Sequence, residues 1–210
     1  MKKTLVLVVL FVLPIVAYLF FASGVNNFGK LPVLTENIFD VAEFSNNSSL
    51  RDKITVLGFL GSNVEQKKGN AFNLNQKIYK RFYEFNDFQF VMIIPKGVED
   101  KIESLKKELG GLVDVEKWKF IYMPENEINT FFLGLKTDLK LDDSYGTPYV
   151  FIIDKDLSLR GRTADEDEGI KYGYNTTSVA ELNNKMEDDV KIILAEYRLA
   201  LKKNNAERIK

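Results

Sequence analysis

Two apolar runs, residues 54–60 (ITVLGFL) and 88–94 (FQFVMII), constrain the fold more than any other part of the sequence. Both are short and rich in β-branched and aromatic residues, which is typical of strands that are covered on both faces. Between them, residues 71–85 carry apolar side chains at spacings near three and four, the pattern of an amphipathic helix that faces a core. Strand, helix and strand in this order predict a parallel βαβ unit inside an α/β sheet.

The chain after this unit continues to alternate between helical and strand patterns. The predicted elements are a helix at 98–109, a strand at 118–122, a helix at 125–135, an antiparallel hairpin at 148–160 and a long helix from 178 to beyond 201. Ser178 is the expected N-cap of the long helix, because Glu181 follows it at the spacing of a capping box. One long terminal helix thus closes the predicted domain.

The 210-residue chain contains no Cys and no His. It therefore lacks the usual nucleophile, the proton carrier that titrates near neutral pH and the soft metal ligands. Thiol–disulfide, zinc and iron–sulfur chemistry are excluded, and we expect no cofactor and no bound metal. Lys and Arg number 29 against 30 Asp and Glu, and this balance offers no general attraction to nucleic acid, which we do not expect as a partner.

The N-terminus predicts a membrane location. Residues 4–22 carry no charge and follow Lys2 and Lys3; as a helix they would span about 28 Å. We expect one transmembrane anchor over residues 1–23, and the alternative is a signal peptide cleaved at the small residues 22–24. Either way the Lys pair stays in the cytoplasm, which places the rest of the chain on the periplasmic side of a bacterial inner membrane.

The chain then divides into three parts. Residues 1–23 are the anchor, residues 24–50 are a tether with a short strand or hairpin around residues 41–44, and residues 51–205 are one folded domain with an extended C-terminal helix. A domain of about 160 residues buries about 70% of the surface of its unfolded chain, so one hydrophobic core is sufficient.

Two longer strings resemble the Sco/SenC family. Residues 114–131 (DVEKWKFIYMPENEINTF) resemble its strand-into-helix segment with a Trp-x-Phe core, and residues 147–162 (TPYVFIIDKDLSLRGR) resemble its hairpin. The resemblance covers roughly residues 52–201 and implies an α/β thioredoxin-like fold, a central mixed sheet flanked by helices. Membrane-tethered thiol reductases of the TlpA and ResA type share Gly-Thr-Pro at residues 146–148, so both groups stay open as relatives.

In the Sco/SenC family a Cys-x-x-x-Cys loop after the first core strand and a distal His bind copper. The loop here reads GSNVEQKKGN, and an ungapped alignment puts Val64 and Lys68 where the thiolates would be. The distal His has no counterpart, because the chain offers only residues 142–145 (DDSY) before the hairpin. The resemblance therefore implies a degenerate member with no catalytic residue and no copper site. The degenerate loop comprises Ser62, Asn63, Val64, Glu65, Gln66, Lys67 and Lys68.

Three further candidate sites follow from the sequence. The Thr147-Pro148 bond is either cis, which would present a backbone edge to an extended partner peptide, or trans at the start of a strand. The acidic run at residues 165–168 could hold calcium, but we favour an exposed loop because the ligand spacing of a calcium loop is missing.

The long helix continues past the domain, so its end either frays into solvent or forms a partner surface. That surface would include Tyr197, Leu199 and Leu201.

These features predict a non-enzymatic protein that acts as a membrane-anchored docking or assembly factor. The family resemblance implies cytochrome c oxidase or its assembly factors as the partner. One alternative is a structural accessory subunit of an envelope complex. The other is an enzyme that has a new site in the loop at residues 62–70 and uses Lys67 or Lys68 with a carboxylate from Glu65 or Asp142.

Overall fold

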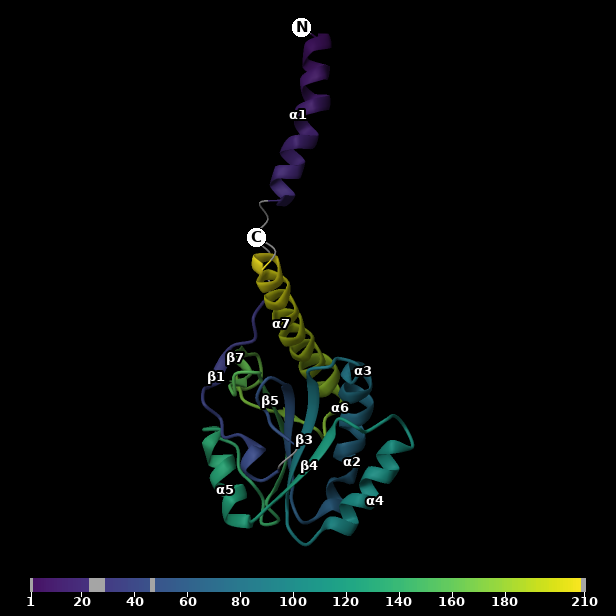
Figure 1. Ribbon diagram of the computed structural model, residues 1–210, viewed down its shortest axis with the longest axis vertical. Helices are drawn as coiled ribbons and strands as arrows, with labels where there is room; N and C mark the ends of the chain where they lie inside the picture. The colour runs from purple at the N-terminus through teal and green to yellow at the C-terminus, as the bar shows by residue number, and fades with distance from the viewer. Residues whose placement is uncertain (1, 23–28, 46–47, 209–210) are drawn as a thin grey trace.

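The centre of the protein is a seven-stranded sheet with the order β1-β6-β5-β2-β3-β4, in which β9 also pairs with β5. The computed structural model describes residues 2–22, 29–45 and 48–208 (Figure 1). The strands of the main sheet are β1 Val33–Thr35, β2 Ile54–Leu60, β3 Phe88–Pro95, β4 Trp118–Met123, β5 Gly146–Ile153, β6 Leu159–Arg160 and β9 Tyr174–Asn175. A separate ribbon consists of β7 Arg162–Asp165 and β8 Gly169–Lys171.

Helical segments connect the strands. They are α1 Lys2–Ala22, the 3₁₀ turn η1 Val41–Glu43, α2 Val64–Leu74 with the π-helical segment η2 Asn75–Tyr79 and α3 Lys80–Phe82, α4 Glu99–Gly110, α5 Glu125–Gly134, and α6 Val179–Glu181 with the π-helical segment η3 Leu182–Met186 and α7 Glu187–Arg208. β2, β3 and β4 are parallel, whereas β5 runs antiparallel to β2. The predicted mixed sheet flanked by helices is confirmed.

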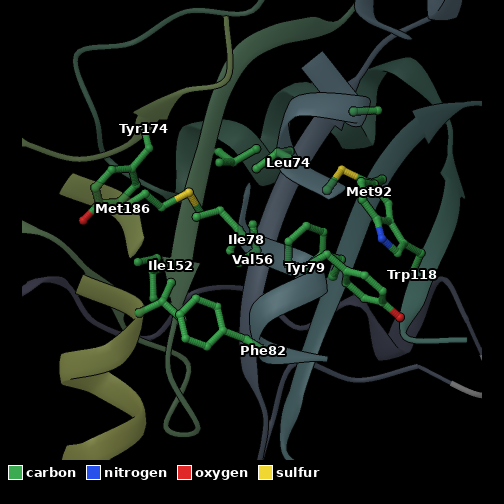
Figure 2. Close-up of a cluster of buried hydrophobic side chains, with 14 of the residues drawn as sticks. Val56, Leu74, Ile78, Tyr79, Phe82, Met92, Trp118, Ile152, Tyr174 and Met186 are labelled. Carbon is green, nitrogen blue, oxygen red and sulfur yellow. The ribbon is translucent and has the colours of Figure 1, made fainter. Parts of the chain in front are cut away.

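Two hydrophobic clusters lie on opposite faces of the sheet. Val56 and Met92 point to the face covered by η2 and η3, where they share a cluster with Ile78 and Met186 (Figure 2). Leu57, one residue on from Val56, belongs to the cluster beneath α5. Every residue of β2 and of β3 is buried. Burial on both faces explains why these strands read as continuous apolar runs, and the prediction of strands at 54–60 and 88–94 is confirmed.

The segment before β2 differs from its prediction. Residues 41–44 do not form a strand; η1 begins after Asp40, whose side chain accepts a hydrogen bond from Ala42 N and so caps a 3₁₀ turn. The segment predicted as a tether contributes Leu31, Ile38 and Leu50 to the core, each at most 3% exposed. Residues 31–45 and 48–50 are therefore part of the folded domain.

Helix α1 covers the stretch that was predicted as an anchor. Within the residues that the structure describes, no helix is long and apolar enough to cross a membrane. The predicted anchor is therefore not confirmed, and the membrane location stays a prediction.

Candidate functional site

The loop between β2 and α2, residues 61–63, leads into the first turns of α2, which hold Val64 and Lys68, the residues that align with the missing thiols. Gly61 directly follows β2 and has a φ of 68°, a conformation that favours glycine. A Cβ atom at this position would lie 2.5 Å from the carbonyl oxygen of Ser144. Ser62 N donates a hydrogen bond of 2.8 Å to the same oxygen. These contacts hold the loop against residues 142–146, the segment that leads into β5.

Lys67 is buried behind this loop. Its side chain is 10% exposed, and its Nζ lies 2.5 Å from Asp142 Oδ2 and 3.4 Å from Ser144 Oγ. A Cβ atom on Gly146 would come within 2.7 Å of Lys67 Nζ. The absence of a side chain at Gly146 therefore makes room for the ammonium group. Lys67 lies on the core-facing side of α2, whose buried residues are Val64, Lys67, Ala71 and Leu74.

Asp142 is held as an anion. Its Oδ1 accepts hydrogen bonds from Ser144 N at 2.9 Å, Ser144 Oγ at 2.6 Å and Gly146 N at 3.0 Å. Burial alone would raise the pKa of Asp142, but hydrogen bonds from Lys67, Ser144 and Gly146 outweigh burial and lower the pKa to about 2. The carboxylate is therefore charged throughout the neutral range, and the ion pair with Lys67 persists there.

The space beside this ion pair is too small for a ligand. A cavity of about 10 Å³ is lined by Lys67, Asn70, Thr147 and Thr176 among others. A single water molecule already needs a cavity of about this size. The space beside Lys67 is thus filled by the protein's own side chains.

The structure brings together one of the lysine–carboxylate pairs that the sequence suggested. Lys67 of α2 meets Asp142, whereas Lys68 of the same helix forms an ion pair of 2.5 Å with Glu108 of α4, which raises the pKa of Lys68. Glu65 is exposed, and Val64 is buried in the core. The site thus contains an ion pair between a buried lysine and a partly exposed aspartate.

Replacement of Asp142 by Asn should lower the free energy of unfolding by about 1 kcal/mol at pH 7. The buried Lys67 would lose its anionic partner, and the figure is small because the Asp142 side chain is 46% exposed. The pKa of Asp142 falls from 3.8 to about 2 on folding, so its contribution is complete above pH 3.8 and is lost as the pH falls toward 2. Urea unfolding at several pH values measures this, with Asp143→Asn as control; equal stability of the two variants at pH 7 would contradict it.

Comparison with known proteins concerns the fold. The sequence matches no protein-family profile and no curated protein sequence. The structure is similar to that of BsSco, a member of the Sco family of cytochrome c oxidase assembly proteins; the two are 14% identical, the match covers 77% of this chain and 95% of BsSco, and the TM-score is 0.51. The fold is thioredoxin-like. At this identity the likeness extends to the fold and no further.

Two other thioredoxin-like structures match over a similar length. The soluble domain of Sco1 from Bacillus subtilis is 18% identical, with 77% of this chain and 94% of that chain covered and a TM-score of 0.45. A thiol:disulfide interchange protein of the thioredoxin family from Chlorobium tepidum is 17% identical, with 79% and 99% covered and a TM-score of 0.48.

The Thr147-Pro148 bond of this thioredoxin-like domain is trans, because the part of the chain that the structure describes contains no cis peptide bond. The cis alternative is therefore wrong. The carbonyl oxygen of Pro148 accepts hydrogen bonds from Thr176 N at 2.9 Å and Thr176 Oγ1 at 2.6 Å. The backbone edge that we considered for a partner peptide is thus occupied at this point by the protein's own chain.

The C-terminal helix only partly provides the predicted partner surface. Tyr197 packs on the β5–β6 turn, where its hydroxyl donates to Asp156 at 3.2 Å and Lys155 Nζ lies 5.6 Å from its ring. Burial, followed by the carboxylates nearby, raises the pKa of Tyr197. Leu199 is 36% exposed and lines a hollow of about 620 Å³ between α7, the β5–β6 turn and the segment before β1. The side chain of Leu201 lies outside the described part of the chain.

The acidic run at residues 165–168 is neither a calcium site nor a fully exposed loop. Asp165 is 1% exposed and lies 2.6 Å from Lys185 Nζ, and Glu168 lies 2.7 Å from Lys171 Nζ. The exposed-loop interpretation is wrong for Asp165, which is buried beside Lys185, whereas Glu166, Asp167 and Glu168 are exposed as expected. Among the described residues, no group of three acidic side chains is placed to hold a metal ion.

A buried polar cluster between the β7–β8 ribbon and the C-terminal helix was missed. Lys171, whose side chain is 0% exposed, pairs with Glu181 at 2.7 Å, and Asp189 accepts hydrogen bonds from Tyr174 Oη and Arg162 Nε. No local pattern marks these positions; the one signal was Glu181, which we interpreted as part of a helix cap. This ribbon cluster comprises Arg162, Lys171, Tyr174, Glu181 and Asp189.

Proposed function

We propose that this protein is a non-redox, Sco-like docking or assembly factor, tethered to the outer face of a bacterial inner membrane, with cytochrome c oxidase or one of its assembly factors as partner. The observation that carries the proposal is that Val64 and Lys68, which align with the reactive thiols of related folds, are buried in the core and paired with Glu108, respectively, and that the Lys67–Asp142 ion pair lies beside them. A chain without Cys or His retains the scaffold but cannot exchange electrons through sulfur.

Separate observations support each part of the proposal. The hollow beside Leu199 offers a contact surface at the end of the domain, in which apolar side chains such as Val33 and Leu199 lie among charged ones. The uncharged residues 4–22 behind a Lys pair support the tether and its orientation. The oxidase partner is supported by the fold shared with BsSco, which belongs to a family of oxidase assembly proteins.

The test is recovery of the partner from membranes. The full chain with a C-terminal tag is expressed in the source bacterium, crosslinked, solubilised in mild detergent and purified, and its partners are identified by mass spectrometry. We expect oxidase or assembly subunits in the membrane fraction, and Leu199→Asp should reduce their recovery about fivefold. Leu112→Asp, at a position 47% exposed and away from the hollow, is the matched control.

Two outcomes would overturn the proposal. The first is recovery of the chain without any specific membrane partner. The second is tight, stoichiometric uptake of copper by the purified chain, since its side chains include no thiolate or imidazole to bind it. Retention of the chain in the finished oxidase would instead support the alternative of a structural accessory subunit.

A further inference from the structure

A small pocket lies between η1 and the first turns of α5, on the opposite face of the sheet from Lys67. Its volume is about 120 Å³, room for a single side chain. Three aromatic rings form its apolar walls and three carboxylates lie around them. The lining residues of this Phe39 pocket are Phe39, Asp40, Glu43, Phe44, Glu127, Thr130 and Phe131.

Phe39 is an exposed aromatic ring held in a fixed place. It is 53% exposed, yet its ring lies against the backbone of α5 at Gly134, where a Cβ atom would be 2.7 Å from two of its ring carbons. The rings of Phe39 and Phe131 have their centroids 6.3 Å apart at a tilt of 52°. These contacts position Phe39 in the lining of the pocket while about half of its surface stays exposed.

The rim of the pocket is negative. Asp40 accepts hydrogen bonds from Ser49 Oγ at 2.6 Å and from Leu50 N at 2.8 Å, and although burial opposes them these bonds lower its pKa. Glu43 and Glu127 form no ion pair with any cation in the described part of the chain, and the lining residues include no Lys or Arg. Three carboxylates thus surround an aromatic pocket with no neutralising charge among its walls.

We infer that the Phe39 pocket binds an arginine side chain of a partner protein. A guanidinium group stacks on aromatic rings through its flat face and donates paired hydrogen bonds to carboxylates at its edge, and the pocket provides both kinds of group. A bare metal ion fits less well, because no three acidic groups of the described residues converge on one point. The inference does not depend on the oxidase partner or on the membrane, because it concerns one side chain and another face of the fold.

The experiment uses the ¹⁵N-labelled full chain in detergent micelles and three short peptides as probes. Acetyl-Gly-Arg-Gly-amide should shift the amide resonances of residues 39–44 and 127–131, with a dissociation constant on the order of 1 mM. The same peptide with citrulline, which keeps the shape but loses the charge, should bind at least about fivefold more weakly. The peptide with lysine should bind more weakly than the arginine peptide, because an ammonium group cannot bind both carboxylates through a planar fork.

Variants tie the binding to the pocket. Glu43→Gln combined with Glu127→Gln should weaken arginine binding about fivefold. Gly134→Ala, which displaces Phe39, should weaken it about threefold, and the positions of distant resonances report whether the fold is intact. Glu36→Gln is the matched control, since Glu36 is an exposed carboxylate of the same segment outside the pocket, and it should leave binding unchanged.

Four results would each overturn the inference. They are equal affinity for the arginine and citrulline peptides, peptide shifts located away from the pocket, the same pocket shifts with calcium chloride alone, and pocket shifts that appear on concentrating the protein without peptide. The last would mean that a second copy of the chain fills the pocket. None of these results bears on recovery of a membrane partner, so the two proposals can fail separately.

Discussion

Asp189→Ala is expected to lower the free energy of unfolding by about 3 kcal/mol and the melting temperature by roughly 10 °C. Asp189 is 3% exposed and accepts hydrogen bonds from Tyr174 Oη at 2.5 Å and Arg162 Nε at 2.7 Å. Without it, the hydroxyl of the fully buried Tyr174 has no acceptor and Arg162 loses its anion. Burial and the neighbouring carboxylate also raise the pKa of Tyr174 well above its ordinary value, so removal of Asp189 should bring that pKa down.

Calorimetry and urea unfolding measure the stability change, and the absorbance of ionised tyrosine measures the pKa. Asp188→Asn is the control on the same helix, since Asp188 is 59% exposed and pairs only with Lys191 among the described residues. It should change stability by less than about 0.5 kcal/mol. If Asp189→Ala were as stable as this control, the ribbon cluster would not hold the β7–β8 ribbon to the helix.

Gly61→Ala is expected to lower the free energy of unfolding by about 2–4 kcal/mol. The positive φ alone makes alanine unfavourable by about 1–2 kcal/mol, and its Cβ atom would lie 2.5 Å from the oxygen of Ser144 and 2.8 Å from Gly146 N. Relief of this contact must push the loop away from residues 142–146. The Lys67–Asp142 ion pair should open with it.

Gly97→Ala separates the two contributions. Gly97 also has a positive φ, 94°, but nothing lies within 4 Å of a Cβ atom there, so this variant should show the conformational cost alone. The difference between the two variants in urea unfolding gives the cost of the contact with Ser144. If Gly61→Ala were no worse than Gly97→Ala, the loop would not be tightly fastened at this point.

The strands at the centre of the sheet, β2 and β3, were predictable because every one of their residues is buried. β2, β3 and β4 match the predicted strands to within one residue at each end. Burial on both faces makes β2 and β3 continuously apolar, whereas β4 lies at the edge of the sheet and is only partly buried. β1 is only three residues long and η1 is a single turn capped by Asp40, too short for a periodic pattern to show. The pattern around residues 41–44 was therefore interpreted as a strand.

The first half of α2 was missed because of Lys67. The buried positions of this helix follow helical spacing, Val64, Lys67, Ala71 and Leu74, but a lysine at one of them removes the apolar signal. The predicted helix therefore began at residue 71, seven residues late. The residue that hid the helix is the one that fills the candidate site.

The ribbon cluster and the Phe39 pocket could not be predicted from local sequence. Arg162 and Asp189 are 27 residues apart, and Asp40 and Glu127 come from separate halves of the domain. Charged residues are exposed in most proteins, so a sequence pattern assigns them to the surface by default. Only the folded chain shows which of them are buried with a partner and which face an open pocket.

Because the candidate site holds the Lys67–Asp142 ion pair in place of thiols, it is insensitive to redox conditions. A pair of cysteines opens and closes with the redox potential of its compartment, whereas an ion pair does not respond to glutathione, oxygen or quinones. On the acid side it is discharged only near the pKa of Asp142, about 2. The surface of the protein at this point is therefore the same in a cell that respires oxygen and in one that has run out of it.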